Sequence, residues 1–158
     1  MRELVLLRHA HAESAAPGQD DRERALSARG RAEAAAAGAW LKEIGFQPDR
    51  VLCSSARRAR ETLDLAQQAF GAAQTESVDA IYEATPGELI AIADSYRDVP
   101  RLLMVGHNPG FEHLAALMST GQSGDFRGMP AAGIAVLKLP SDATLEPGVA
   151  KLSAFWMP

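Results

Sequence analysis

The sequence predicts an α/β fold, a three-layer α/β/α sandwich with a mainly parallel central sheet. Short, mostly apolar runs at residues 4–7, 50–53 and 101–105 indicate strands that are buried on both faces. Longer stretches rich in alanine and leucine separate these runs and are typical of helices. Strands that alternate with helices form βαβ units and hence a parallel sheet. No repeat or linker interrupts the pattern, so a single domain is expected over residues 1–158.

Capping and turn residues place four helices between the strands. Serine or threonine before a helix and glycine after it satisfy the free main-chain groups at its ends. The expected helices are residues 28–44, between Ser27 and Gly45; a helix capped by Ser54 or Ser55 that ends at Phe70 before Gly71; a helix that starts at Thr85-Pro86 and ends near Tyr96; and a helix after Gly110 that ends near Ser119. Further strands are expected at residues 76–81, 133–139 and 151–156.

Composition and charge narrow the class of protein. Hydrophobic residues make up 47% and charged residues 23%, an ordinary globular mixture. The formal net charge of −4 disfavours nucleic acid as a partner, because phosphate backbones bind basic surfaces. No apolar stretch is long enough for a signal-peptide core or a membrane span, and the single cysteine, Cys53, cannot form an internal disulfide. We therefore expect a cytoplasmic protein that binds neither membranes nor nucleic acid.

Polar residues follow each of the three strongest strands. Arg8 and His9 follow the first strand, a serine pair and an arginine cluster around Arg58 follow the second, and His107 follows the third. Ligands bind at the carboxyl edge of such sheets, so these side chains are expected to meet there. Guanidinium groups bind phosphoryl oxygens in pairs of hydrogen bonds and offset their charge. The set therefore indicates a site for a dianionic phosphoryl group.

Four motifs occur in a fixed order along most of the chain. They are Leu-Arg-His-Ala-His-Ala-Glu at residues 7–13, Leu-Ser-Ala-Arg-Gly at residues 26–30, Ser-Ser-Ala-Arg-Arg-Ala-Arg-Glu-Thr at residues 54–62, and Gly-His-Asn-Pro at residues 106–109. Together they resemble the motifs of the histidine phosphatases, the phosphoglycerate mutase-like superfamily. The alanine after the first histidine, with Arg24 and Glu83, is similar to the small SixA-type branch, the phosphohistidine phosphatases. The third motif aligns the phosphate-binding arginine of the family with Arg58.

The resemblance implies a phosphoglycerate mutase-like fold and a phosphatase that works through phosphohistidine on His9. A main-chain carbonyl would hold the other ring nitrogen of this histidine. Arg8, Arg58 and a protonated His107 would bind the phosphoryl oxygens and stabilise the transition state. Glu83 would protonate the leaving group and then activate water. No metal ion or other cofactor is implied, and the partner would be a phosphorylated protein histidine or a small phosphorylated metabolite.

Several assignments stay open at the level of single residues. Glu83 precedes a helix, where acidic residues are common for electrostatic reasons alone, and the first loop holds three rival acids, Glu13, Asp20 and Asp21. His11 either lines the mouth of the pocket or is exposed. Structural or solvent-facing roles are expected for Arg57, Arg60 and His113.

Three other functions fit parts of the pattern. A mutase would need a lid that keeps water from the phosphoenzyme, and the loops at residues 10–24 and 120–131 look too short for one. A non-catalytic phosphoryl-binding module would not need the complete set of two histidines and two arginines. A metal hydrolase that uses His9, His11 and His107 has a known ligand spacing, but no acidic cluster accompanies it.

Overall fold

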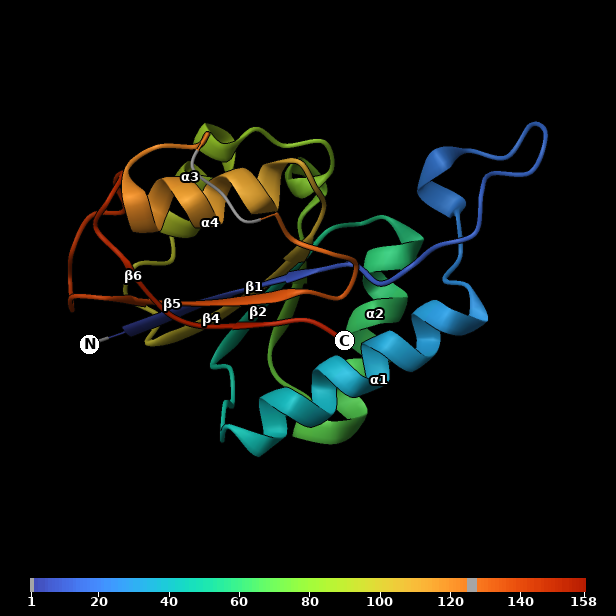
Figure 1. The fold of residues 1–158 in the computed structure, drawn as a ribbon, viewed down its shortest axis with the longest axis horizontal. Coiled ribbons are helices and arrows are strands. Elements are labelled where there is room, and N and C mark those ends of the chain that lie inside the picture. Colours follow the sequence, from blue (N-terminus) through green and yellow to red (C-terminus); the bar gives the residue numbers. More distant parts are fainter. Residues whose placement is uncertain (1, 125–127) are drawn as a thin grey trace.

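The computed structural model describes residues 2–124 and 128–158, so part of the loop at 120–131 lies outside the described residues. The described residues form a sheet with the strand order β3-β2-β4-β1-β5-β6 (Figure 1). Its strands are β1 (Arg2–Arg8), β2 (Arg50–Cys53), β3 (Thr75–Ser77), β4 (Arg101–Gly106), β5 (Ile134–Leu139) and β6 (Lys151–Trp156). β3, β2, β4 and β1 are parallel to one another, whereas β5 and β6 are each antiparallel to the preceding strand in this order. The predicted mainly parallel sheet is therefore confirmed.

Helices cover both faces of the sheet (Figure 1). α1 (Ala28–Glu43) and α2 (Arg57–Phe70) lie on one face, and α3 (Pro86–Asp94) and α4 (Gly110–Thr120) lie on the other. Two short 3-10 helices, η1 (Asp21–Glu23) and η2 (Asp79–Ile81), lie in the connecting segments. This arrangement confirms the predicted three-layer sandwich. Among the described residues, no helix has both the length and the apolar character that a membrane crossing needs.

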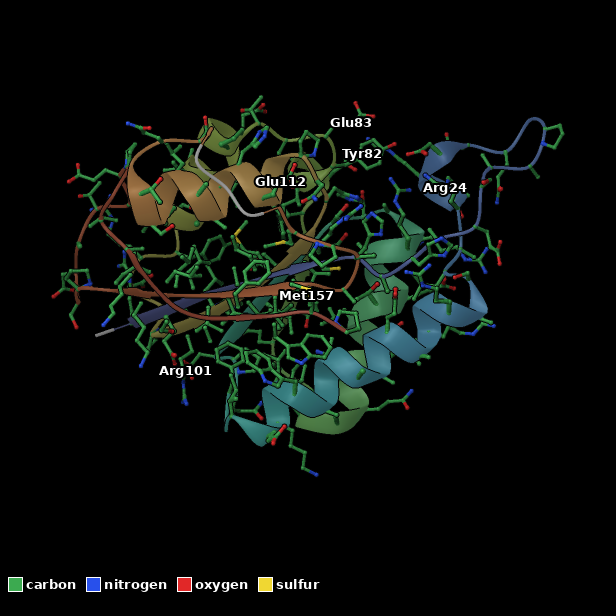
Figure 2. The ribbon with its side chains drawn as sticks, in the orientation of Figure 1. Arg24, Tyr82, Glu83, Arg101, Glu112 and Met157 are labelled. Carbon is green, nitrogen blue, oxygen red and sulfur yellow. The ribbon has the colours of Figure 1, made fainter. Side chains whose placement is uncertain are left out.

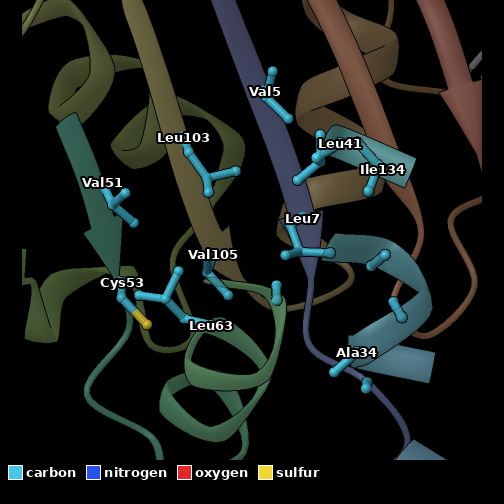
Figure 3. Close-up of a cluster of buried hydrophobic side chains, with 14 of the residues drawn as sticks. Val5, Leu7, Ala34, Leu41, Val51, Cys53, Leu63, Leu103, Val105 and Ile134 are labelled. Carbon is cyan, nitrogen blue, oxygen red and sulfur yellow. The ribbon is translucent and has the colours of Figure 1, made fainter. Parts of the chain in front are cut away.

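The apolar runs of the central strands supply two cores, one on each face of the sheet. Val5 and Leu7 of β1 belong to the core under α1 and α2, which Figure 3 shows. Leu4 and Leu6 point to the opposite face and belong to the core under α3 and α4. Side chains alternate between the two faces along a strand, so a strand covered on both sides must be apolar throughout.

Two glycines allow α1 to approach its neighbours closely. A Cβ atom on Gly38 would lie 2.3 Å from the carbonyl oxygen of Ala66 in α2. A Cβ atom on Gly30 would lie 1.9 Å from the carbonyl oxygen of His11 in the first loop. Ser27 caps this helix as predicted, since its hydroxyl accepts from the Gly30 N–H at 3.0 Å. The glycine in the first turn therefore gives space to the chain that follows the first strand.

The predicted serine cap of α2 is wrong. The N-cap residue is Ala56, which forms no side-chain capping bond. The hydroxyl of Ser54 contacts His107, and the hydroxyl of Ser55 donates to Asp79. Both serines precede the helix, but their side chains serve tertiary contacts.

The strand predicted at residues 76–81 is shorter than expected. Only Thr75–Ser77 pairs with β2, and the chain then turns into η2. β2 has four residues, so β3 has no further partner positions in the parallel direction. The turn carries Tyr82 and Glu83 towards the carboxyl edge of the sheet, where they line a cavity.

Candidate active site

A cavity of about 520 Å³ lies at the carboxyl edge of β1, β2 and β4. All five residues with expected roles line it: Arg8, His9, Arg58, Glu83 and His107. Tyr82 and Arg24, labelled with Glu83 in Figure 2, line it as well. The βαβ topology thus brings together residues that are far apart in the chain.

His9 is held in one tautomer by the main chain. Its ring Nδ1 lies 2.8 Å from the carbonyl oxygen of Ala10. A carbonyl can only accept, so Nδ1 carries the hydrogen and Nε2 keeps a free lone pair. Burial lowers the pKa of His9 to about 3, and the nearby positive charges of Arg58 and Arg8 add to this effect. The ring is therefore neutral near pH 7, which a nitrogen nucleophile requires.

Arg8 and Arg58 place two guanidinium groups in the cavity, and some of their N–H groups have no acceptor within the described ranges. Arg8 donates from one terminal nitrogen to the carbonyl of Met129 at 2.8 Å. Arg58 donates to the main-chain carbonyl of Asp21 at 2.7 Å and to its carboxylate at 3.0 Å. The buried Nε of each arginine has no acceptor among the described residues. The pair can offer further hydrogen bonds to an anion, the ligand class that guanidinium forks favour.

His107 lies beside His9, and its low pKa indicates a neutral ring instead of the protonated ring that the resemblance implies. The two ring centroids are 5.1 Å apart, and Tyr82 contacts the His107 ring edge-on at 5.4 Å. Burial, followed by the charge of Arg58, lowers the pKa of His107 to about 4. His107 is therefore neutral near pH 7. A phosphoryl dianion next to the ring would raise this pKa, because an opposite charge favours the protonated form.

Glu83 lies exposed at the rim of the cavity, between η2 and α3. Its φ angle of 57° is in the left-handed region, which costs free energy for a residue with a Cβ atom. The capping box between Thr85 and Glu88 fixes the start of α3 directly after it. Backbone strain of this kind is concentrated at functional positions.

Of the rival acids, Asp21 lines the cavity but is already engaged as an anion. It accepts hydrogen bonds from Tyr82, Arg24 and Arg58. The Tyr82 hydroxyl, more than any other group, holds the pKa of this carboxyl far below its usual range. Asp20 instead caps η1 by accepting from the N–H of Arg22 at 2.9 Å. Neither arrangement suits a group that must donate a proton near neutral pH.

The remaining candidates divide between the cavity and the outer surface. His11 is exposed and outside the cavity lining, and its Nδ1 lies 2.7 Å from the hydroxyl of Ser27. His113 of α4 does line the cavity, which the sequence did not indicate. Arg57 and Arg60 are exposed on α2, in agreement with a solvent-facing helix surface. No group of three or more His, Cys, Asp or Glu side chains that could hold a metal ion occurs within residues 2–124 and 128–158.

Tyr82 and Thr62 were not recognised as site residues from the sequence, and Ser54, which was expected at this sheet edge, was given no role of its own. Tyr82 lines the cavity and bonds Asp21, and Ser54 contacts His107 at 2.7 Å. Thr62 is fully buried and accepts from the Ala10 N–H at 3.0 Å. The only sequence signal for Thr62 was its place in the third motif, and Ser54 was indicated by that motif and by its place after the second strand.

Comparisons with known proteins find similar sequences and similar folds. Residues 4–101 match the family model of the histidine phosphatase superfamily (branch 1). An uncharacterized protein of Mycobacterium tuberculosis is 38% identical over 158 residues, covering 94% of this chain and 98% of that protein.

Solved structures share the whole fold. A candidate phosphohistidine phosphatase SixA of Agrobacterium tumefaciens is 30% identical with a TM-score of 0.85, and 99% of each chain is covered. A second candidate SixA, from Nakamurella multipartitia, has the same identity and TM-score and covers 99% of this chain and 96% of that one. A protein histidine phosphatase SixA complexed with tungstate is 22% identical, with a TM-score of 0.84 over 98% of this chain and 96% of that one, and shares the fold.

Proposed function

This chain belongs to the histidine phosphatase superfamily, in its SixA-type branch, and on that basis we propose that it is a phosphatase whose His9 carries the phosphoryl group as phosphohistidine. The observation that supports this most directly is the Nδ1 hydrogen bond of His9 to Ala10, 2.8 Å long. It leaves Nε2 unprotonated in a cavity that also holds two guanidinium groups. A neutral imidazole nitrogen in that setting is an activated nucleophile.

The reaction proceeds in two displacements at phosphorus. Nε2 of His9 forms a bond to phosphorus while the bond to the leaving group breaks, and Glu83 gives its proton to the leaving group. Water then attacks phosphorus, Glu83 takes a proton from that water, and the P–Nε2 bond breaks to release inorganic phosphate. Arg8, Arg58 and His107 bind the equatorial oxygens, on which negative charge is spread in the transition state.

We propose a phosphorylated histidine of a partner protein as the substrate. The two relatives at 30% identity are candidate phosphohistidine phosphatases, and the cavity is large enough for an imidazole that carries a phosphoryl group. A small phosphomonoester is the alternative, to be compared directly in a panel of phosphohistidine protein, sugar phosphates and nucleotides. A cytoplasmic location stays a prediction.

The first experiment compares His9→Ala with the matched variant His11→Ala. We expect His9→Ala to abolish hydrolysis of an aryl phosphate, and His11→Ala, which alters an exposed histidine outside the cavity, to retain it. Quenched wild-type enzyme should carry an acid-labile, base-stable phosphoryl group that is absent from His9→Ala. Activity should also survive treatment with a chelator, because the arginines supply the positive charge. Equal turnover by wild type and His9→Ala would disprove the mechanism.

A further inference from the structure

We propose that Ser54 is a positioning residue that fixes the tautomer of His107, so that a neutral His107 presents its Nδ1–H to a phosphoryl oxygen. This inference rests on the proposed function, since it concerns how the same site binds the transferred group. It assigns a role to a buried hydroxyl that the two displacement steps do not use.

Hydrogen bonding between β2 and β4 holds Ser54 next to His107. It follows β2 directly, and its N–H donates to the carbonyl of Val105 in β4 at 3.0 Å. Ser54 is completely buried, and its Oγ lies 2.7 Å from Nε2 of His107. This distance is that of a well-formed hydrogen bond in which either group could be the donor.

The remaining partner of the hydroxyl decides the direction of that bond. Oγ of Ser54 also accepts from the N–H of Ala56 at 3.2 Å. If Nε2–H of His107 donated to the same oxygen, the buried hydroxyl hydrogen would have no acceptor in the described part of the chain, which is unfavourable. If the hydroxyl donates to Nε2, both the hydroxyl of Ser54 and Nε2 of His107 have a partner. Ser54 is therefore the donor, and His107 carries its own hydrogen on Nδ1.

This tautomer leaves the Nδ1–H available to a ligand. His107 lines the cavity, and its Nδ1 makes no hydrogen bond within residues 2–124 and 128–158. A neutral N–H donor adds a hydrogen bond without placing a third positive charge beside two guanidiniums. The low pKa of His107, about 4, agrees with a neutral ring. The ring is surrounded by other titratable groups: His9, Tyr82, Asp21, Arg8 and Arg58.

The tautomer can be measured directly in the wild-type protein. Nuclear magnetic resonance of ¹⁵N-labelled histidine distinguishes Nδ1–H, Nε2–H and doubly protonated rings, and the His107 signals are those missing from His107→Asn. At pH 7 we expect His107 to be neutral and protonated on Nδ1. An Nε2–H tautomer or an imidazolium at this pH would overturn the inference, whatever the variants do.

Two serine variants test whether the tautomer of His107 affects the turnover of an aryl phosphate. Ser54→Ala should shift His107 towards Nε2–H and lower kcat about 10-fold, less than the roughly 10²–10³ that complete loss of such a donor costs. Ser55→Ala is the matched control, because the Ser55 hydroxyl donates to Asp79 outside the cavity lining, and it should change neither quantity. An unchanged tautomer and kcat in Ser54→Ala would contradict the proposed role.

A third pair tests whether a neutral donor is sufficient. The amide of His107→Asn can place an N–H close to the position of Nδ1, so this variant should retain more kcat than His107→Ala. Equal loss in both would contradict a neutral donor. Failure of this inference is distinguishable from failure of the proposed function. If His9→Ala is inactive but His107 has the Nε2–H tautomer, only the role of Ser54 is refuted. If His9→Ala remains active, the proposed function itself is refuted.

Discussion

At the scale of single residues, Thr62 connects the segment after β1, which carries His9, with the first turn of α2, which carries Arg58. Its hydroxyl accepts from the Ala10 N–H and donates to the Arg58 carbonyl at 2.7 Å. Ala10 in turn accepts from the ring of His9. One buried hydroxyl therefore contacts both the segment that holds the ring of His9 and the helix turn that carries Arg58, the proposed nucleophile and a proposed phosphate-binding residue.

Thr62→Val tests this connection, because valine keeps the shape and removes both hydrogen bonds. The buried Ala10 N–H would lose its acceptor, so we expect the free energy of unfolding to fall by about 1–3 kcal/mol and kcat to fall as His9 loses its fixed orientation. Urea unfolding and aryl phosphate turnover measure the two effects. Thr75→Val, at an exposed threonine, is the control, and equal behaviour of both variants would contradict the role.

Residues whose position depends on strand ends were predictable, and those positioned by tertiary contacts were not. Arg8 ends β1, and His9 and His107 directly follow β1 and β4, so their meeting at one sheet edge follows from topology. Ser54 also follows a strand, but a serine before a helix is equally typical of a cap. Tyr82 had no local signal, since its place depends on where β3 ends and η2 begins.

At the scale of elements, the small residues of α1 set its distance from α2. Gly38 faces the main chain of Ala66, and no side chain larger than hydrogen fits between the helices. The alanine and leucine content predicted the helices, but it did not indicate which glycine lies at the closest approach between them. Helix boundaries were predicted well where a cap acts locally, as at Ser27 and Thr85.

Gly38→Ala should therefore destabilise the protein although alanine favours helices. We expect the loss to be about 1–3 kcal/mol, because the added methyl forces α1 away from α2. Gly87→Ala in α3 is the matched control: a Cβ atom there meets no other atom within 4 Å, and we expect a gain of about 0.4–1 kcal/mol. Thermal and urea unfolding compare the two, and similar stability of both would contradict the packing argument.

At the scale of the whole molecule, the buried histidines couple stability to pH. The pKa values of His9 and His107, about 3 and about 4, lie below the ordinary value of 6.5 that the unfolded chain has. The unfolded state therefore binds more protons between pH 4 and pH 6.5. The stability that the neutral rings provide is complete above pH 6.5 and is lost as the pH falls towards the folded values.

We expect the free energy of unfolding to decrease between pH 7 and pH 5, by roughly 1–2 kcal/mol for each of the two rings. Urea unfolding at the two pH values measures the difference. His107→Asn removes one of the two groups and should reduce the decrease, whereas His11→Asn, at an exposed histidine, should preserve it. A decrease that His107→Asn leaves unchanged would contradict the assignment.

β4 lies at the centre of the candidate site, between β2 and β1 in the sheet. β1 and β2 are not hydrogen-bonded to each other, because β4, from the second half of the chain, lies between them. His9, after β1, and Arg58, at the start of α2, therefore lie on either side of the end of β4, which His107 directly follows. An amino-terminal fragment that ends before β4 lacks both this central strand and His107, so we expect it to lack the proposed activity.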